Sequence, residues 1–155
     1  MTIAPPARVG MSLDEVDTPA LLIDLDAFER NLDRMADAAA QLGVRLRAHA
    51  KTHKSPVIAN MQIARGAIGQ CCQKVGEAEI LVAGGVADVL VSNQVIGASK
   101  IARLAGLARH ATVRVCVDDA NNIDDLAAAA RQHGSCLSVL VEIDVGTGRC
   151  GVAPG

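Results

Sequence analysis

The chain has 155 residues and half of them are hydrophobic, so it is long and apolar enough to bury at least one globular core, which excludes a disordered chain. Its formal net charge is −2, with basic and acidic residues mixed and no Lys/Arg block interleaved with aromatics, which argues against nucleic acid or an anionic membrane as a partner. The opening MTIAPPARVG lacks the apolar segment and cleavage pattern of a secretory leader, and later apolar runs are too short to cross a membrane, so we expect a cytoplasmic protein.

The predicted elements alternate between strands and helices. After a proline-rich arm, residues 18–25 (TPALLIDL) predict a strand, and Asp26 is the expected cap of a helix that Gly43 ends. Ser55 is the expected cap of the next helix. Five further strands are expected at residues 44–51, 67–74, 87–93, 112–119 and 137–146, with helices at 55–66, 75–85, 97–110 and 121–134 between them. This order predicts right-handed crossovers, a parallel sheet and the α/β class.

The strand faces favour a barrel over an open sheet with helices on both sides. In the strand over residues 44–51, the alternation places Arg45, Arg47, His49 and Lys51 on one face and only apolar residues on the other. Four basic side chains are not expected beneath helices without partners, so this face should line a shared interior where arginines meet carboxylates.

The predicted domain organisation follows from this barrel. A complete (β/α)8 barrel needs eight strands and about 250 residues. We therefore expect residues 26–155 to form about five of the eight β/α units of a truncated barrel, and residues 1–25 to form an arm and a strand.

The densest group of chemically versatile side chains is RAHAKTHKSP, residues 47–56, at the expected carboxyl end of a strand. Barrel enzymes build their sites at that end. A lysine there forms an imine with an aldehyde when its amine is neutral, and nearby cations such as Arg47 or Lys54 would favour the neutral form of Lys51. The alternative is a solvated basic turn with both lysines on the surface. Spacing alone favours this alternative, and the inward alternation of Lys51 narrows the difference.

Two other segments carry candidate ligand groups. VEIDVGTGRCGV, residues 141–152, combines inward-facing carboxylates, a glycine-rich turn and Arg149. CCQKVGEAE, residues 71–79, has two cysteines on opposite strand faces, which do not readily share a metal, and leaves Gln73 as the group more suited to face a ligand. A tight strand exit in the first segment and a helix start in the second explain the same residues without a ligand.

Three segments in this order resemble one family: RAHAKTHK, CCQKVGEAE followed by DVLVSNQVIG, and VEIDVGTGRCGV. Together they resemble D-threonine aldolase and its close relatives over roughly residues 17–153. That group includes D-3-hydroxyaspartate aldolase and the eukaryotic-type D-serine dehydratase. With alanine racemase it belongs to the fold-type III pyridoxal-phosphate enzymes.

The resemblance implies pyridoxal 5'-phosphate as cofactor and assigns a role to four residues. Lys51 would be the catalytic lysine that holds the cofactor as a Schiff base, and Arg149 would hydrogen-bond the phenolic oxygen of the cofactor. His49 and Gln73 would lie beside the cofactor. Ala48 stands where the family commonly has proline, a difference that removes no chemical group.

The resemblance also implies an activity, the cleavage of D-β-hydroxy amino acids such as D-threonine or D-3-hydroxyaspartate to glycine and an aldehyde. It implies a divalent metal, manganese or magnesium, whose ligands are expected outside this chain. A homodimer is one assembly open to the full-length protein, and the sequence does not determine the oligomeric state. We expect the chain by itself to be inactive, because the rest of the barrel, a phosphate loop and a β domain that residues 18–25 would join are expected elsewhere. Dehydration as in D-serine dehydratase, amino-acid racemisation, non-catalytic carriage of the cofactor and an inert scaffold stay open as alternatives.

Overall fold

A computed structural model describes residues 5–155, and the chain divides into two compact units, one ending at Asn31 and the other spanning Leu32–Gly155. No helix in the described part is long and apolar enough to cross a membrane. The elements in order are η1 (Leu13–Glu15), α1 (Leu25–Gln41), β1 (Ala48–His49), α2 (Pro56–Ala64), β2 (Gln70–Cys72), α3 (Val75–Ala83), β3 (Asp88–Val91), α4 (Ala98–Leu107), β4 (Thr112–Val117), α5 (Ala120–His133) and β5 (Ser138–Val141).

The first strand predicted from the sequence is not formed. Residues 20–24 have no regular secondary structure, and Leu21 is fully exposed. A strand requires a neighbour to pair its backbone groups, and no strand of the described residues pairs with this segment. Helix α1 also begins earlier than expected, because Asp24, and not Asp26, caps it: the Asp24 carboxylate accepts a hydrogen bond from the Ala27 N–H at 2.9 Å.

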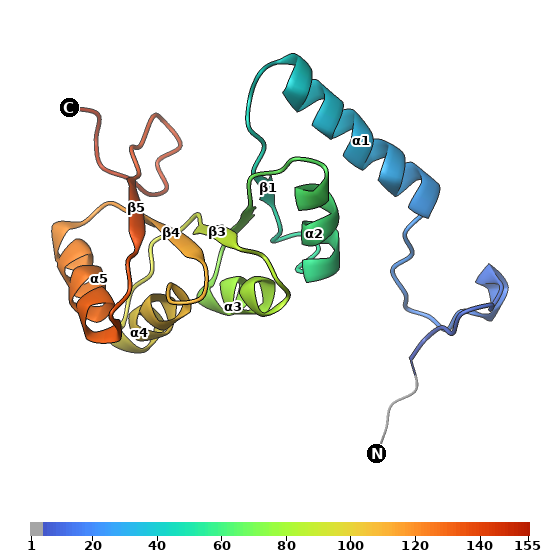
Figure 1. The fold of residues 1–155 in the computed structure, drawn as a ribbon, viewed down its shortest axis with the longest axis horizontal. Coiled ribbons are helices and arrows are strands. Elements are labelled where there is room, and N and C mark those ends of the chain that lie inside the picture. Colours follow the sequence, from blue (N-terminus) through green and yellow to red (C-terminus); the bar gives the residue numbers. More distant parts are fainter. Residues whose placement is uncertain (1–4) are drawn as a thin grey trace. The chain divides into compact units, whose positions relative to one another are not determined.

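The second unit is a parallel sheet in which every strand pairs with the next one along the chain, in the order β1-β2-β3-β4-β5. Figure 1 shows helices α2 to α5 along one side of this sheet. Sequential order with helices on one face is the arrangement of part of a (β/α) barrel, whereas an open doubly wound sheet reverses its strand order and carries helices on both faces. The prediction of an α/β, barrel-type fold is therefore confirmed.

The helix-covered face of the sheet holds the core. Alternate residues of β3 and β4, such as Val89, Val91 and Val115, are fully buried against helix residues such as Leu81 and Leu104. Because parallel strands alternate strictly, each buried valine fixes which neighbours point to the other face.

The opposite face is polar, as the sequence predicts. The Arg47 guanidinium donates to the Asp88 carboxylate at 2.8 Å, and Arg114 pairs with the same carboxylate. Gly69 leaves room for this arrangement, since a Cβ there would lie 2.6 Å from Arg47 Nη1. The expectation that arginines meet carboxylates on this face holds for Arg47, whereas Arg45 is exposed and has no ion pair within residues 5–155.

Candidate functional site

The turn that follows β1 carries Lys51 and is built around two histidine rings. Nδ1 of His49 accepts the Lys51 N–H at 3.2 Å, and Nδ1 of His53 accepts the Ser55 N–H at 3.0 Å. Ser55 then caps α2, as predicted, by accepting the Ile58 N–H. The two ring acceptors bond backbone amides that are four residues apart, so the turn is ordered, although both of its lysines are exposed as in the alternative of a solvated basic turn.

The contacts of His49 also indicate which of its ring nitrogens carries the hydrogen. A neutral imidazole that accepts at Nδ1 carries its hydrogen on Nε2, which lies 3.3 Å from Ser92 Oγ, and that hydroxyl donates to the Cys72 carbonyl at 3.2 Å. Burial, and then the positive charge of Lys51, lowers the pKa of His49 from its ordinary value of 6.5, so the neutral ring is favoured. The prediction that His49 borders a cofactor is not tested by these contacts; they show that it positions the backbone of Lys51.

The two lysines of the turn differ in their partners. Lys54 Nζ lies 3.4 Å from Glu77, whose pKa is lowered because hydrogen bonds from the Gln73 N–H and from Lys54 outweigh the opposing effect of burial. Lys51 is exposed and has no carboxylate within ion-pair distance in the described part of the chain. Arg47 and Lys54, the two cations expected to act on the Lys51 amine, are each paired with a carboxylate, so their charge is partly offset.

A cleft of about 560 Å³ opens at the carboxyl ends of β2 and β3. Gln73 lines it, together with Lys54, Glu77 and Gln94. The cleft is not lined by Lys51, His49 or Arg149. Of the predicted site residues only Gln73 lines it, and Lys54 is the residue of the turn that it shares with Gln73.

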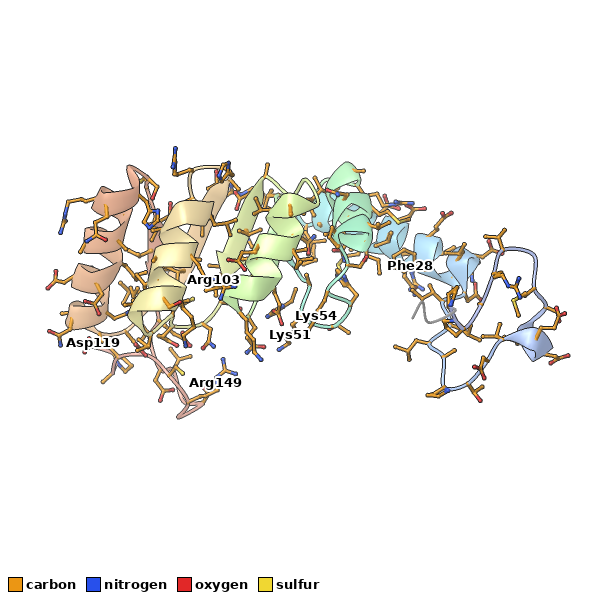
Figure 2. The ribbon with its side chains drawn as sticks, turned by 90° about the horizontal axis from the view of Figure 1, so that it is seen from below. Phe28, Lys51, Lys54, Arg103, Asp119 and Arg149 are labelled. Carbon is orange, nitrogen blue, oxygen red and sulfur yellow. The ribbon has the colours of Figure 1, made fainter. Side chains whose placement is uncertain are left out.

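Arg149 lies in the loop of residues 144–151 that follows β5, and its side chain is exposed. Figure 2 shows Lys51, Lys54, Asp119 and Arg149 at the same edge of this unit, where the strands have their carboxyl ends. Asp144 organises the loop by accepting the N–H groups of Gly146 at 2.9 Å and Gly148 at 3.0 Å.

The structure adds three polar residues that the sequence analysis did not identify as a group: Gln94 after β3, Asp118 after β4 and Glu142 after β5. The Gln94 side-chain amide donates to Asp118 at 3.0 Å and to Glu142 at 2.8 Å. Each residue follows a strand of the same parallel sheet, so the shared signal in the sequence is a polar residue just beyond the apolar run. Of the three, only Glu142 was noted, as an inward-facing carboxylate.

The described residues hold no cluster of three or more His, Cys, Asp or Glu side chains suited to a metal ion. The adjacent cysteines lie on opposite faces, as expected, with Cys72 in the helix-covered core. Burial raises the pKa of Cys72 to about 12, so this thiol stays protonated and inert.

Three known proteins are similar to this chain over nearly its whole length. The 3-hydroxy-D-aspartate aldolase of Paracoccus denitrificans (strain Pd 1222) is 53% identical over 149 residues, which are 95% of this chain and 38% of that protein. The D-threonine aldolase of Arthrobacter sp. is 50% identical over 153 residues, 99% of this chain and 40% of that protein. The crystal structure of D-threonine aldolase from Filomicrobium marinum matches 99% of this chain and 42% of its own, with a TM-score of 0.96 and 56% sequence identity.

The chain thus spans 38–42% of the length of these relatives. At the level of families, residues 23–155 match the alanine racemase N-terminal domain. That match covers most of the chain and includes the whole sheet. The chain belongs to the alanine racemase N-terminal domain family.

Proposed function

We propose that this chain provides the cofactor lysine of a pyridoxal-phosphate-dependent lyase that cleaves D-β-hydroxy amino acids to glycine and an aldehyde. The observation that carries the proposal is Lys51, an exposed amine without a carboxylate partner in residues 5–155, in a turn that two histidines hold in one shape. Two of the relatives described above, a 3-hydroxy-D-aspartate aldolase and a D-threonine aldolase, support the reaction class.

The residues present fit the cofactor. An aldehyde requires a primary amine to hold it covalently, and Lys51 offers one at the end of the sheet where barrel enzymes bind ligands. A phenolate oxygen requires a donor, and the exposed guanidinium of Arg149 lies at that same edge. The N–H groups of Gly146 and Gly148 are already bonded to Asp144, so we do not assign the cofactor phosphate to this loop.

In this proposal each residue of the chain has a separate task. When bound, pyridoxal phosphate supplies an electron sink for the pair released as the bond between Cα and Cβ breaks. Lys51 holds the cofactor, Arg149 donates to its phenolic oxygen, and Gln73 borders it from the end of β2. His49 acts at one step removed, by accepting the Lys51 N–H and so orienting the lysine.

Four further features stay predictions. A base or a metal-polarised hydroxyl must take the β-hydroxyl proton, and we propose a manganese or magnesium ion whose ligands are not in this chain. Assembly as a homodimer and a cytoplasmic location are proposed on the sequence analysis alone. The choice between D-threonine and D-3-hydroxyaspartate also stays open.

The first experiment maps the lysine that reacts. The chain is mixed with pyridoxal phosphate, reduced with borohydride and digested, and the modified peptides are identified by mass spectrometry. We expect the label on Lys51 in preference to Lys54, Lys74 and Lys100, loss of that label in Lys51→Ala, and its retention in the matched control Lys54→Ala. Labelling spread evenly over the four lysines would contradict the proposed site.

A second measurement separates the reaction types in the protein that carries this chain. Aldol cleavage of D-threonine releases glycine and acetaldehyde, dehydration releases ammonia and a 2-oxo acid, and inversion at Cα produces L-allo-threonine. We expect glycine from the unaltered protein and none above background from Lys51→Ala. A 2-oxo acid as the main product would replace the aldolase assignment with a dehydratase.

A further inference from the structure

The loop of residues 144–151 has three anchors, and two of them lie within its own segment. Asp144 holds Gly146 and Gly148, and at the base of the loop Val152 donates to the Glu142 carbonyl and accepts the Asp144 N–H, both at 2.9 Å. These contacts give the loop its shape. Its base is joined to β4 by the Glu142 N–H, which donates to the Val117 carbonyl at 2.9 Å, so the glycine-rich turn itself needs a further contact to the neighbouring strands.

The third anchor joins the loop to the rest of the sheet. The Gly151 N–H donates to Asp118 Oδ2 at 2.9 Å, from the loop to the residue that follows β4. Only glycine fits here, since its φ is +104° and a Cβ would lie 2.6 Å from the Asp144 nitrogen. Within the described residues, this is the one side-chain hydrogen bond that ties residues 144–151 to another strand.

Asp118 is in turn held by Gln94. The two hydrogens of the Gln94 amide are divided between Asp118 Oδ2 at 3.0 Å and Glu142 Oε2 at 2.8 Å. The Asp118 and Glu142 carboxylates accept from the same amide group, so their negative charges repel each other. The neutral Gln94 amide donates to both, which offsets that repulsion and restrains both side chains. Gln94 thus connects the ends of β3, β4 and β5.

From these contacts we infer that Gln94 is a positioning residue for Arg149: its amide fixes Asp118, Asp118 fixes the Gly151 N–H, and this sets the loop that presents the guanidinium to the cofactor. The inference rests on the proposed function for the task of Arg149, whereas the loop contact itself does not. A leucine at position 94 keeps the size of the side chain and removes both donors.

The test compares Gln94→Leu with the unaltered chain by amide hydrogen exchange, read residue by residue by NMR. We expect amide exchange at Gly151 to become about fivefold faster or more. The reason is that Asp118, the acceptor of the Gly151 N–H, loses the hydrogen bond from Gln94 that holds its carboxylate in place. Gly146 and Gly148 serve as internal controls, since their acceptor is Asp144, and their exchange should not change. Gln132→Leu, at an exposed glutamine on α5, is the matched control variant.

Two Asp118 variants separate geometry from charge. Asp118→Ala should reproduce the faster exchange at Gly151, and Asp118→Asn should restore most of the protection because an amide oxygen still accepts from Gly151. Unchanged exchange at Gly151 in both Gln94→Leu and Asp118→Ala would overturn the inference, whether or not the chain binds pyridoxal phosphate.

The link to the cofactor needs a spectroscopic readout. In the protein loaded with pyridoxal phosphate, a cation displaced from the phenolic oxygen should raise the pH midpoint of the cofactor absorbance by about one unit in Gln94→Leu. Faster exchange with an unmoved midpoint would overturn the positioning role and leave only a structural contact. Failure of the unaltered chain to label at Lys51 would count against the proposed function, and Gly151 exchange would still decide the loop contact.

Discussion

The two faces of the sheet differ in what holds them and in what they offer. On the helix-covered face, side chains such as Val115 and Leu104 have no exposed surface and are held by close packing. On the opposite face, Arg47 and Asp88 keep 15% and 24% of their side chains exposed and are held by charge and hydrogen bonds. The same strands supply both faces, so alternation separates the residues that stabilise the fold from those available for chemistry.

The largest expected effect tests the close-packed face. Leu104→Ala removes a fully buried side chain and leaves a cavity, so we expect the free energy of unfolding to fall by about 2–5 kcal/mol in urea denaturation. Leu90→Ala is the matched change on the other face of the sheet. The Leu90 side chain, on β3, is only half-buried, so this change should lower the free energy of unfolding by about 1 kcal/mol. Equal costs for the two variants would mean that both faces are packed alike.

A smaller effect tests the polar face. Hydrogen bonds from Arg47 and Arg114 outweigh burial and lower the pKa of Asp88, and Asp88→Ala leaves both guanidinium groups without this acceptor. We expect the free energy of unfolding to fall by about 1–2 kcal/mol, since the group is partly solvated. The matched control is Glu79→Ala, which breaks the more exposed pair with Arg103 on the helix side and should cost below about 1 kcal/mol. A larger loss at Glu79 would show that position on the sheet does not decide the strength of these pairs.

Local patterns in the sequence predicted the fold well because each depends on neighbours along the chain. Alternation identified the strands and their faces, and Ser55 was recognised as a cap from its position before an apolar run. The strand at residues 18–25 failed because its stability depends on a pairing partner, and local pattern carries no information about that partner. Asp24 was missed as the cap because it lay inside that predicted strand, which made Asp26, two residues later, the first acidic residue available.

The candidate site was predicted less completely, for a related physical reason. Lys51 was selected as a candidate because the unusual group of charges lies in one short segment, and its role stays a prediction. Gln94, Asp118 and Glu142 come from three separate segments and meet only when consecutive strands pair in register, so none of the three segments shows the group. Which carboxylate pairs with Arg47 depends likewise on the register between β1, β2 and β3.

The smallest expected effect concerns the pH dependence of stability, and it arises in the Lys51 turn at the carboxyl end of β1. Burial lowers the pKa of both His49 and His53 from 6.5, and each ring accepts a backbone N–H at Nδ1, a contact that protonation destroys. The unfolded chain therefore binds protons more readily than the folded chain does. The stability that the neutral rings contribute is present above about pH 6.5 and is lost as the pH falls through their lowered folded-state pKa values.

We therefore expect the free energy of unfolding, measured in urea, to decrease between pH 7.5 and pH 5.5, above the range in which Asp88 and the other carboxylates take up protons. His49→Asn retains an acceptor near the Lys51 N–H but cannot be protonated, so it should reduce this dependence. The same substitution at the exposed His110, outside the turn, separates the loss of this histidine from the loss of any histidine. An unchanged slope in His49→Asn would mean that the neutral ring of His49 does not contribute to the pH dependence and does not order the Lys51 end of the turn.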